Sequence, residues 1–237
     1  MSTREEMTSA LAEVTHFMKY PRLMPWIGAK YLKHRILVIG ESHYLPKGAT
    51  YQHEAAAWYN GCETALRKHL AAACPDENGI NWIDTSGILR RRSTDMATGE
   101  RKKFSAKGHA IYRNLFSTFN TASMFKLDDY RDTIDFIAYF NYFQRPAEFP
   151  GKSIILHEKD KEIAAKTLNK ILVILQPKMI AVVSKKAGKL VRPLIMDYSH
   201  IVTAHPSSSW WNRRTKSGYC GRQDLLNFLN QNTSHCR

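Results

Sequence analysis

Residues 35–44 read RILVIGESHY, and this stretch decides the fold class. Its first half is a short run of apolar and β-branched residues that stops at Gly40, a pattern typical of a strand buried on both faces. Such strands belong to parallel sheets that helices cover on either side. The second half, from Glu41 to Tyr44, places polar and ionisable side chains directly after the strand. Because ligands of open α/β sheets bind beyond the carboxyl ends of the strands, this segment is the first candidate for a functional site.

Further strand and helix patterns alternate along the rest of the chain. The strand patterns lie at residues 134–140, 179–183 and 200–203. Helical patterns lie at about residues 7–20, 50–73, 159–175, 185–195 and in a terminal helix carrying Leu225, Leu226 and Leu229. This alternation predicts an α/β fold, a three-layer α/β/α sandwich with a central, mainly parallel sheet. We expect one domain over residues 1–237, with an N-terminal helical extension over 1–30.

Two of these helices give specific expectations about burial. The first has apolar residues at helical spacing, which predicts one amphipathic helix that ends before Pro21. Its expected buried face consists of Met7, Leu11, Val14 and Met18. The second, a crossover helix over 50–73, is expected to break at Gly61. Its predicted buried positions are Ala55, Ala56, Tyr59, Ala65, Leu66 and Leu70.

The chain is strongly basic. It has 35 lysine and arginine residues against 21 aspartate and glutamate residues, a formal net charge of +14 and a pI near 9.7. This imbalance favours a polyanionic partner, with nucleic acid as the leading class, because contacts between basic side chains and phosphates release counterions. A basic protein whose charge serves only solubility is the alternative. Basic residues also gather over 90–109, which we interpret as an exposed loop, either tracking DNA or simply solvated.

Other features argue against a secreted protein, a membrane protein or a metalloprotein. Charged residues interrupt the first 20 residues, where a signal peptide would need an apolar core. The longest apolar run, 171–175, is far shorter than the roughly 20 residues that span a bilayer. We therefore expect a soluble, cytoplasmic protein. The cysteines are far apart without a C-x-x-C pair, so we expect free thiols and no metal or other cofactor at Cys62, Cys74, Cys220 and Cys236.

Polar motifs follow three of the predicted strands. Residues 40–44 (GESHY) follow the first, Asn141 ends the second shortly before Arg145 and Pro146, and residues 205–207 (HPS) follow the last. Another strand comes directly after the letters QPK. This order of motifs, over most of the chain, resembles that of the uracil-DNA glycosylase superfamily. The resemblance implies a monofunctional DNA glycosylase that flips a pyrimidine out of DNA, hydrolyses its N-glycosidic bond and leaves an abasic site.

The resemblance assigns the chemistry and the base recognition to four residues. Glu41 matches the acidic position that orients or deprotonates the attacking water and stabilises an oxocarbenium-like sugar. His205 matches the histidine that donates a hydrogen bond to O2 of the departing base. Gly40 would let the backbone approach the flipped nucleotide, and Asn141 matches the asparagine that reads the base edge. A loop carboxylate, a structural histidine and a turn-forming asparagine are the ordinary alternatives.

The remaining implied contacts line the base pocket or reach the DNA backbone. Ser42, His43 and Tyr44 would line the pocket, and Tyr44 corresponds to the tyrosine that excludes 5-substituted pyrimidines. Ser207 would bind a phosphate. The residues expected to enter the minor groove or to anchor phosphates beside it are Ser208, Ser209, Trp210, Trp211, Arg213 and Arg214. A buried position for one of the two tryptophans is the alternative.

The motifs also depart from those of the superfamily. His43 stands where a proline is usual, and Ser42 stands where the best-known uracil glycosylases carry aspartate. The iron–sulfur cysteines of one subgroup are absent. The target base therefore stays open between uracil and a 5-modified or hypermodified cytosine, which defence enzymes of the superfamily attack in phage DNA. A module that binds unusual or damaged DNA without cutting it is the alternative from another class of proteins.

Overall fold

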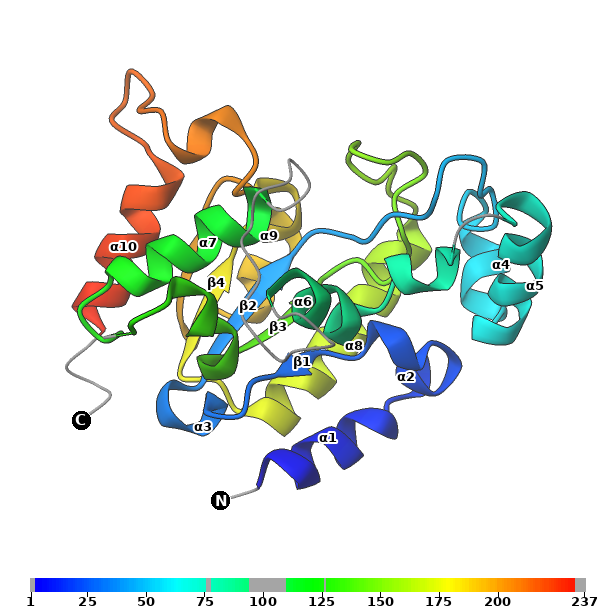
Figure 1. Ribbon diagram of the computed structural model, residues 1–237, viewed down its shortest axis with the longest axis horizontal. Helices are drawn as coiled ribbons and strands as arrows, with labels where there is room; N and C mark the ends of the chain where they lie inside the picture. The colour runs from blue at the N-terminus through cyan, green and yellow to red at the C-terminus, as the bar shows by residue number, and fades with distance from the viewer. Residues whose placement is uncertain (1–2, 76–77, 94–109, 126, 233–237) are drawn as a thin grey trace. The chain divides into compact units, whose positions relative to one another are not determined.

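The computed structural model describes residues 3–75, 78–93, 110–125 and 127–232 (Figure 1). Most of the basic segment predicted over 90–109 lies outside these residues. The exception is residues 90–93. The sequence predicts a loop there, but these residues form the last turn of helix α6 (Thr85–Ser93). The backbone N–H of Gly87 donates to the carboxylate of Asp84 at 2.7 Å, which satisfies a donor at the start of this helix.

The α/β class expected from the sequence is confirmed. Within the described residues, five strands form one sheet in the order β1-β3-β2-β4-β5. β2 pairs in parallel with β4, and β4 pairs in parallel with β5, with Ile36 opposite Met179 and Met179 opposite Ser199. The strands are β1 (Trp26–Ile27), β2 (Ile36–Gly40), β3 (Ile137–Asn141), β4 (Met179–Val182) and β5 (Ser199–Val202). Every residue of β2, β3 and β4 is buried, whereas β5 at the edge is half-exposed.

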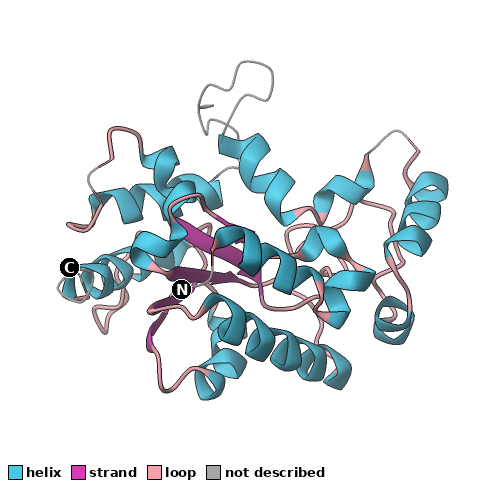
Figure 2. Cartoon of the chain, turned by 90° about the horizontal axis from the view of Figure 1, so that it is seen from below, coloured by secondary structure: helices cyan, strands magenta, loops and turns pink. Residues whose placement is uncertain are grey.

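Helices are the commoner element and are coloured cyan in Figure 2. The α-helices other than α6 are α1 (Arg4–Ala12), α2 (Thr15–Lys19), α3 (Tyr31–His34), α4 (Ala55–Asn60), α5 (Glu63–Ala73), α7 (Ala110–Thr121), α8 (Glu158–Leu175), α9 (Lys185–Val191) and α10 (Gly221–Gln231). Short 3-10 helices are η1 (Pro21–Leu23), η2 (Gly79–Trp82), η4 (Tyr130–Phe136), η5 (Arg192–Leu194) and η6 (Ser209–Trp211). No described helix is long and apolar enough to cross a bilayer.

The described residues group into two compact units, and each unit takes its residues from three separate segments. The first unit draws on Met1–Trp26, Glu41–Ile88 and Phe140–Gln176. The second draws on Ile27–Gly40, Leu89–Tyr139 and Pro177–Arg237. The single domain expected over the whole chain stays a prediction.

An aromatic and aliphatic core holds the first unit together. α1 and α4 both pack against α8. The ring of Tyr20 stacks on that of Trp58 with centroids 4.4 Å apart, and its hydroxyl donates to the Trp58 carbonyl at 2.7 Å. The indole N–H of Trp58 donates to the carbonyl of Gln144 at 3.1 Å, so the polar atom of this fully buried side chain has a hydrogen-bond partner.

The second unit is built around the parallel strands β2, β4 and β5. Helix α9 lies so close to β5 that a Cβ on Gly188 would meet a methyl group of Val202 at 2.1 Å. Only a residue without a side chain allows this approach. Helix α10 packs on α7, and the side-chain oxygen of Asn230 accepts a hydrogen bond from the backbone N–H of Ser123 at 2.8 Å.

Several local expectations need correction. The predicted N-terminal helix is two helices, because the chain breaks between α1 and α2. As a result Phe17 is buried, whereas Met18, expected on the buried face, is 66% exposed.

The break at Gly61 is confirmed, since α4 ends at Asn60 and a Cβ on Gly61 would overlap the hydroxyl of Tyr51. Ala56 is exposed and Ala65 only half-buried, while Trp58 supplies the buried surface. The strand predicted over 134–140 starts at Ile137, because the preceding residues form η4. Helix α7 was not expected.

Candidate active site

Glu41 lies directly after β2 and beside the chain that follows β3. Its carbonyl accepts a hydrogen bond from the backbone N–H of Phe143 at 2.9 Å, and the carbonyl of His43 accepts one from Ala147 at 2.9 Å. These two bonds join the segment after β2 to the segment after β3. The hydroxyl of Ser153 donates to Oε1 of the Glu41 carboxylate. The structure therefore brings the candidate carboxylate next to the loop that begins at Asn141.

His43 supports this segment from inside the unit. Its side chain is buried, with Nε2 at 3.1 Å from the Thr85 hydroxyl. Burial lowers the pKa of His43 to about 4, although the Asp84 carboxylate acts in the opposite direction. The ring is therefore neutral near pH 7. The expectation that His43 faces the base pocket has no support from this buried position, which instead indicates a packing role.

Its neighbours Ser42 and Tyr44 are half-buried. Burial raises the pKa of the Tyr44 hydroxyl, and the charge of Glu41 acts in the same direction. The phenol is therefore a neutral hydrogen-bonding group near pH 7, next to the candidate carboxylate. Both residues remain candidates for the pocket lining.

Asn141 is the last residue of β3 and is buried. Its carbonyl accepts a hydrogen bond at 2.6 Å from the side-chain amide of Gln144, which also approaches the carbonyl of Tyr142 at 3.3 Å. Gln144 therefore closes the turn after the strand with its own side chain. Both interpretations of the Asn141 side chain, turn formation and base reading, stay predictions.

The ring orientation of His205 in the second unit follows from its neighbour Ser207. Its Nδ1 lies 3.3 Å from the backbone nitrogen of Ser207 and 2.8 Å from the Ser207 hydroxyl. A backbone N–H can only donate, so Nδ1 acts as an acceptor and the ring proton of this tautomer sits on Nε2. Asn114 from α7 holds the adjacent Pro206 carbonyl at 2.7 Å, and Ser208 donates to the His205 carbonyl at 2.8 Å. The contacts of Nδ1 thus favour the tautomer that carries its proton on Nε2.

The carboxyl edge of the parallel strands carries two of the predicted segments. Ile39 of β2 lies opposite Val182 of β4, which lies opposite Val202 of β5. Because all three strands run in the same direction, Gly40 and the residues leading to His205 leave the sheet at the same edge. The expectation that these segments follow strand ends is confirmed. Asn141 also ends its strand, β3, in the same sheet.

The two adjacent tryptophans lie in different environments, and the prediction that Trp211 enters the minor groove of DNA is wrong. Trp210 is 53% exposed, whereas Trp211 is fully buried. A Cβ on Gly221 would meet the Trp211 ring at 3.2 Å, and the Trp211 carbonyl accepts a hydrogen bond from the Cys220 thiol at 3.3 Å. Consecutive residues of η6 project in different directions, so the Trp211 ring fills the core and the Trp210 ring faces solvent.

The other predicted DNA contacts lie in the same stretch of the second unit. Arg213 and Arg214 are exposed, as phosphate contacts require. Ser207 and Ser209 are also exposed, and Ser208 is half-buried. No group of three or more histidine, cysteine, aspartate or glutamate residues able to hold a metal occurs in the described part of the chain. The described cysteines are free thiols.

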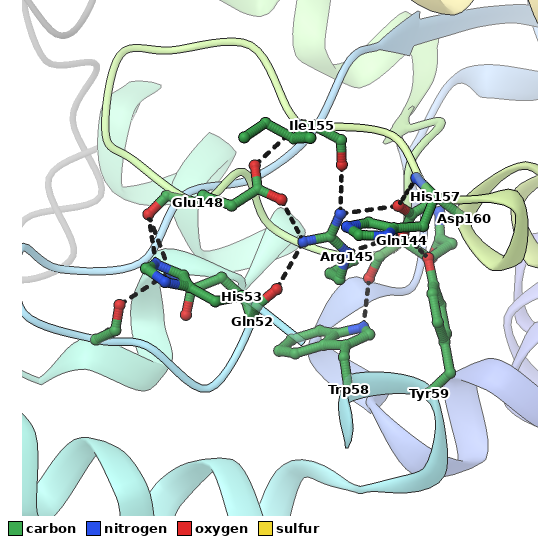
Figure 3. Close-up of polar contacts among 11 residues, drawn as sticks. Gln52, His53, Trp58, Tyr59, Gln144, Arg145, Glu148, Ile155, His157 and Asp160 are labelled. Carbon is green, nitrogen blue, oxygen red and sulfur yellow. Dashed lines mark hydrogen bonds and ion pairs between the residues drawn. The ribbon is translucent and has the colours of Figure 1, made fainter. Parts of the chain in front are cut away.

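Sequence reasoning missed a buried ionic network centred on Arg145 (Figure 3). Its guanidinium makes five hydrogen bonds, one for each N–H group. Two of them form a bidentate pair with Asp160, at 2.9 and 2.8 Å. The others reach the Glu148 carboxylate and the carbonyls of Gln52 and Ile155. One side chain thus ties together the segment before α4, the loop after β3 and the first turn of α8.

In the two carboxylates of this network, both oxygen atoms accept hydrogen bonds. Asp160 also accepts hydrogen bonds from the Tyr59 hydroxyl at 2.8 Å and from the backbone N–H of His157 at 2.9 Å. Burial alone would raise the pKa of Asp160, but its hydrogen bonds from Arg145, His157 and Tyr59 hold the pKa below the ordinary value. The sequence marks the dipeptide Arg145-Pro146 only as part of a motif, because the partners of Arg145 lie up to 93 positions away in the chain.

No model of a known protein family matches the sequence, and no curated protein matches it.

Proposed function

We propose that this protein is a monofunctional DNA glycosylase with a three-layer α/β/α fold of the uracil-DNA glycosylase type. The observation that carries the proposal is the hydrogen bond between the Ser207 backbone N–H and Nδ1 of His205. It leaves the ring proton on Nε2, the form of histidine that can donate to a base oxygen. The strand-end position of Glu41, its hydrogen bond from Ser153 and the net charge of +14 support the same function.

The proposed reaction breaks the bond between C1′ of the sugar and the ring nitrogen of a flipped pyrimidine. The electron pair of that bond leaves with the base, so negative charge develops on the base oxygen O2. Nε2–H of His205 donates a hydrogen bond to O2 and stabilises this charge in the transition state. The Glu41 carboxylate stabilises the positive sugar and accepts a proton from the water that attacks C1′. The products are the free base and an abasic site.

The substrate is a nucleotide extruded from DNA, since its glycosidic bond is out of reach inside the base stack. In this proposal, Asn141 reads the base edge and Trp210 fills the space that the base leaves. Ser207, Arg213 and Arg214 bind phosphates. Uracil and 5-modified or hypermodified cytosines are the candidate bases.

The test is single-turnover cleavage of duplexes that carry uracil, a modified cytosine or only ordinary bases, followed by detection of abasic sites. We expect cleavage of one of the first two and none of the third. Replacement of His205 by Ala should slow cleavage by about 10²–10³-fold, as loss of a single transition-state donor does elsewhere, with little effect on DNA binding. His200→Ala, on the preceding strand β5, is the matched control and should leave the rate unchanged.

A second variant tests the carboxylate. Glu41→Gln keeps the size of the side chain but its neutral amide cannot accept the proton of water, so cleavage should fall while folding and binding persist. Glu162→Gln, in the exposed ion pair with Lys166, is the control for loss of one negative charge. Full activity of Glu41→Gln would remove this residue from the mechanism. Binding of DNA by the wild type without any abasic product would favour a binding module instead.

A further inference from the structure

The loop that links β3 to α8 presents an apolar tip to solvent. Phe149 is 56% exposed and Ile155 is 58% exposed, and residues 150–153 between them are exposed as well. Pro150 and Gly151 make the turn, and Gly151 has a φ of +76°, a conformation that favours glycine. More than half of each of these two side chains is in contact with water. Two such side chains on one loop make a candidate contact for a partner.

The base of this loop is held rigidly by the Arg145 network. Arg145 donates to the Ile155 carbonyl at 2.6 Å, and the Glu148 carboxylate accepts the Ile155 backbone N–H at 2.8 Å (Figure 3). The His53 ring meets the Phe149 ring with centroids 5.5 Å apart, while its Nε2 lies 3.0 Å from the Glu148 carbonyl. The backbone on either side of the tip is thus held by hydrogen bonds, and the contact with His53 limits the freedom of the Phe149 ring, which lowers the entropy lost on binding.

The same loop touches the candidate active site. Ser153, four residues after Phe149, donates its hydroxyl hydrogen bond to the Glu41 carboxylate. A partner of Phe149 would therefore lie near a carboxylate to which we assign chemistry on DNA. The exposed Lys152 at the tip supplies a cation that can meet a phosphate, in a chain whose net charge is +14.

We propose that Phe149 stacks on an unpaired base of the bound DNA strand, with Lys152 against a phosphate of that strand. The inference rests on the proposed function, because it takes DNA as the partner of the Glu41 site. Aromatic side chains stack on every base, so this contact would add affinity without selecting a sequence. It would hold the strand beside the nucleotide that reacts.

Binding of a fluorescently labelled oligothymidine strand, measured over a range of salt concentrations, tests the proposal. Phe149→Ala should weaken binding by roughly 5- to 150-fold, the range for loss of one base–aromatic stack. Its dependence on salt should match that of the wild type, because no phosphate contact is lost. Lys152→Ala should instead flatten the salt dependence by about one counterion. Phe149→Tyr should retain most of the affinity, because it keeps the aromatic face.

Val173→Ala is the matched control, since Val173 is 72% exposed on α8 and has no role in the site. Photo-crosslinking to a strand containing 5-iodouracil should join the DNA to the peptide that contains Phe149. Wild-type affinity in Phe149→Ala, or crosslinks confined to other peptides, would overturn the proposal while leaving glycosylase activity untouched. A wild type that binds DNA through Phe149 without cutting it would support the contact and reject the glycosylase. A wild type with no affinity for DNA would overturn both.

Discussion

Replacement of Arg145 by Met should destabilise the protein severely. The guanidinium is completely buried and is the partner of two carboxylates, Asp160 at 0% and Glu148 at 7% side-chain exposure. Met fills similar space but donates no hydrogen bond, so both anions stay buried without their cation. Breaking a buried pair in this way costs about 3–5 kcal/mol, a large share of the roughly 5–15 kcal/mol that stabilises a typical domain. Arg145→Lys should also fail to restore stability, because three donors replace five.

Urea unfolding of the full chain, followed by tryptophan fluorescence and circular dichroism, measures these costs. Arg145→Met combined with Asp160→Asn should be less destabilised than the sum of the single variants, since removing the buried charge removes part of the penalty. Arg67→Met is the matched control, because it breaks a pair with Glu63 in which Arg67 is 47% exposed, and such pairs contribute at most about 1 kcal/mol. A loss of about 1 kcal/mol or less in Arg145→Met would refute the reasoning.

Two further predictions concern acid stability and the adjacent tryptophans. Burial lowers the pKa of His16, His34 and His43 to about 4 from the ordinary 6.5, so each group contributes stability above pH 6.5 that is lost as pH falls toward 4. The free energy of unfolding should drop by roughly 1 kcal/mol per pH unit for each histidine in this window, and urea midpoints that are equal at pH 7 and pH 5 would contradict this. Trp211→Ala should cost about 3–5 kcal/mol of stability, whereas Trp210→Ala should leave thermal unfolding unchanged and weaken cleavage of duplex more than of single-stranded DNA. Circular dichroism melts and paired cleavage assays separate the two, and equal losses on both substrates would argue against a wedge at Trp210.

The buried parallel strands and α8 could be predicted because their signals are local. An uninterrupted apolar run such as 36–39 in β2 is buried whatever its neighbours are, and Pro177 stops α8 two residues after its last helical turn. The prediction of one continuous helix from the apolar spacing between Met7 and Met18 is wrong. Two short helices, joined at Glu13 and Val14, keep this spacing but bury different faces. The spacing of apolar residues alone does not reveal a break between two helices.

The candidate site was predictable where a residue directly follows a strand, as with Glu41, Asn141 and His205. The residues that orient these groups were not. Ser153 lies 112 positions after the carboxylate it contacts, and nothing near it in the sequence marks it. The separation of Trp210 from Trp211 depends on the geometry of η6, which composition does not encode.

The interleaving of the two units has a consequence for biosynthesis. Six segments alternate between them, so the polypeptide passes from one to the other five times. A nascent chain cannot complete the first unit before α8 has left the ribosome, or the second before α10 has done so. β2 is among the first strands made, yet its partner β4 emerges about 140 residues later, so the backbone N–H and C=O groups that pair with β4 and the apolar side chains of β2 wait for their partners during most of translation. We expect the growing chain to depend on chaperones until its last quarter is made.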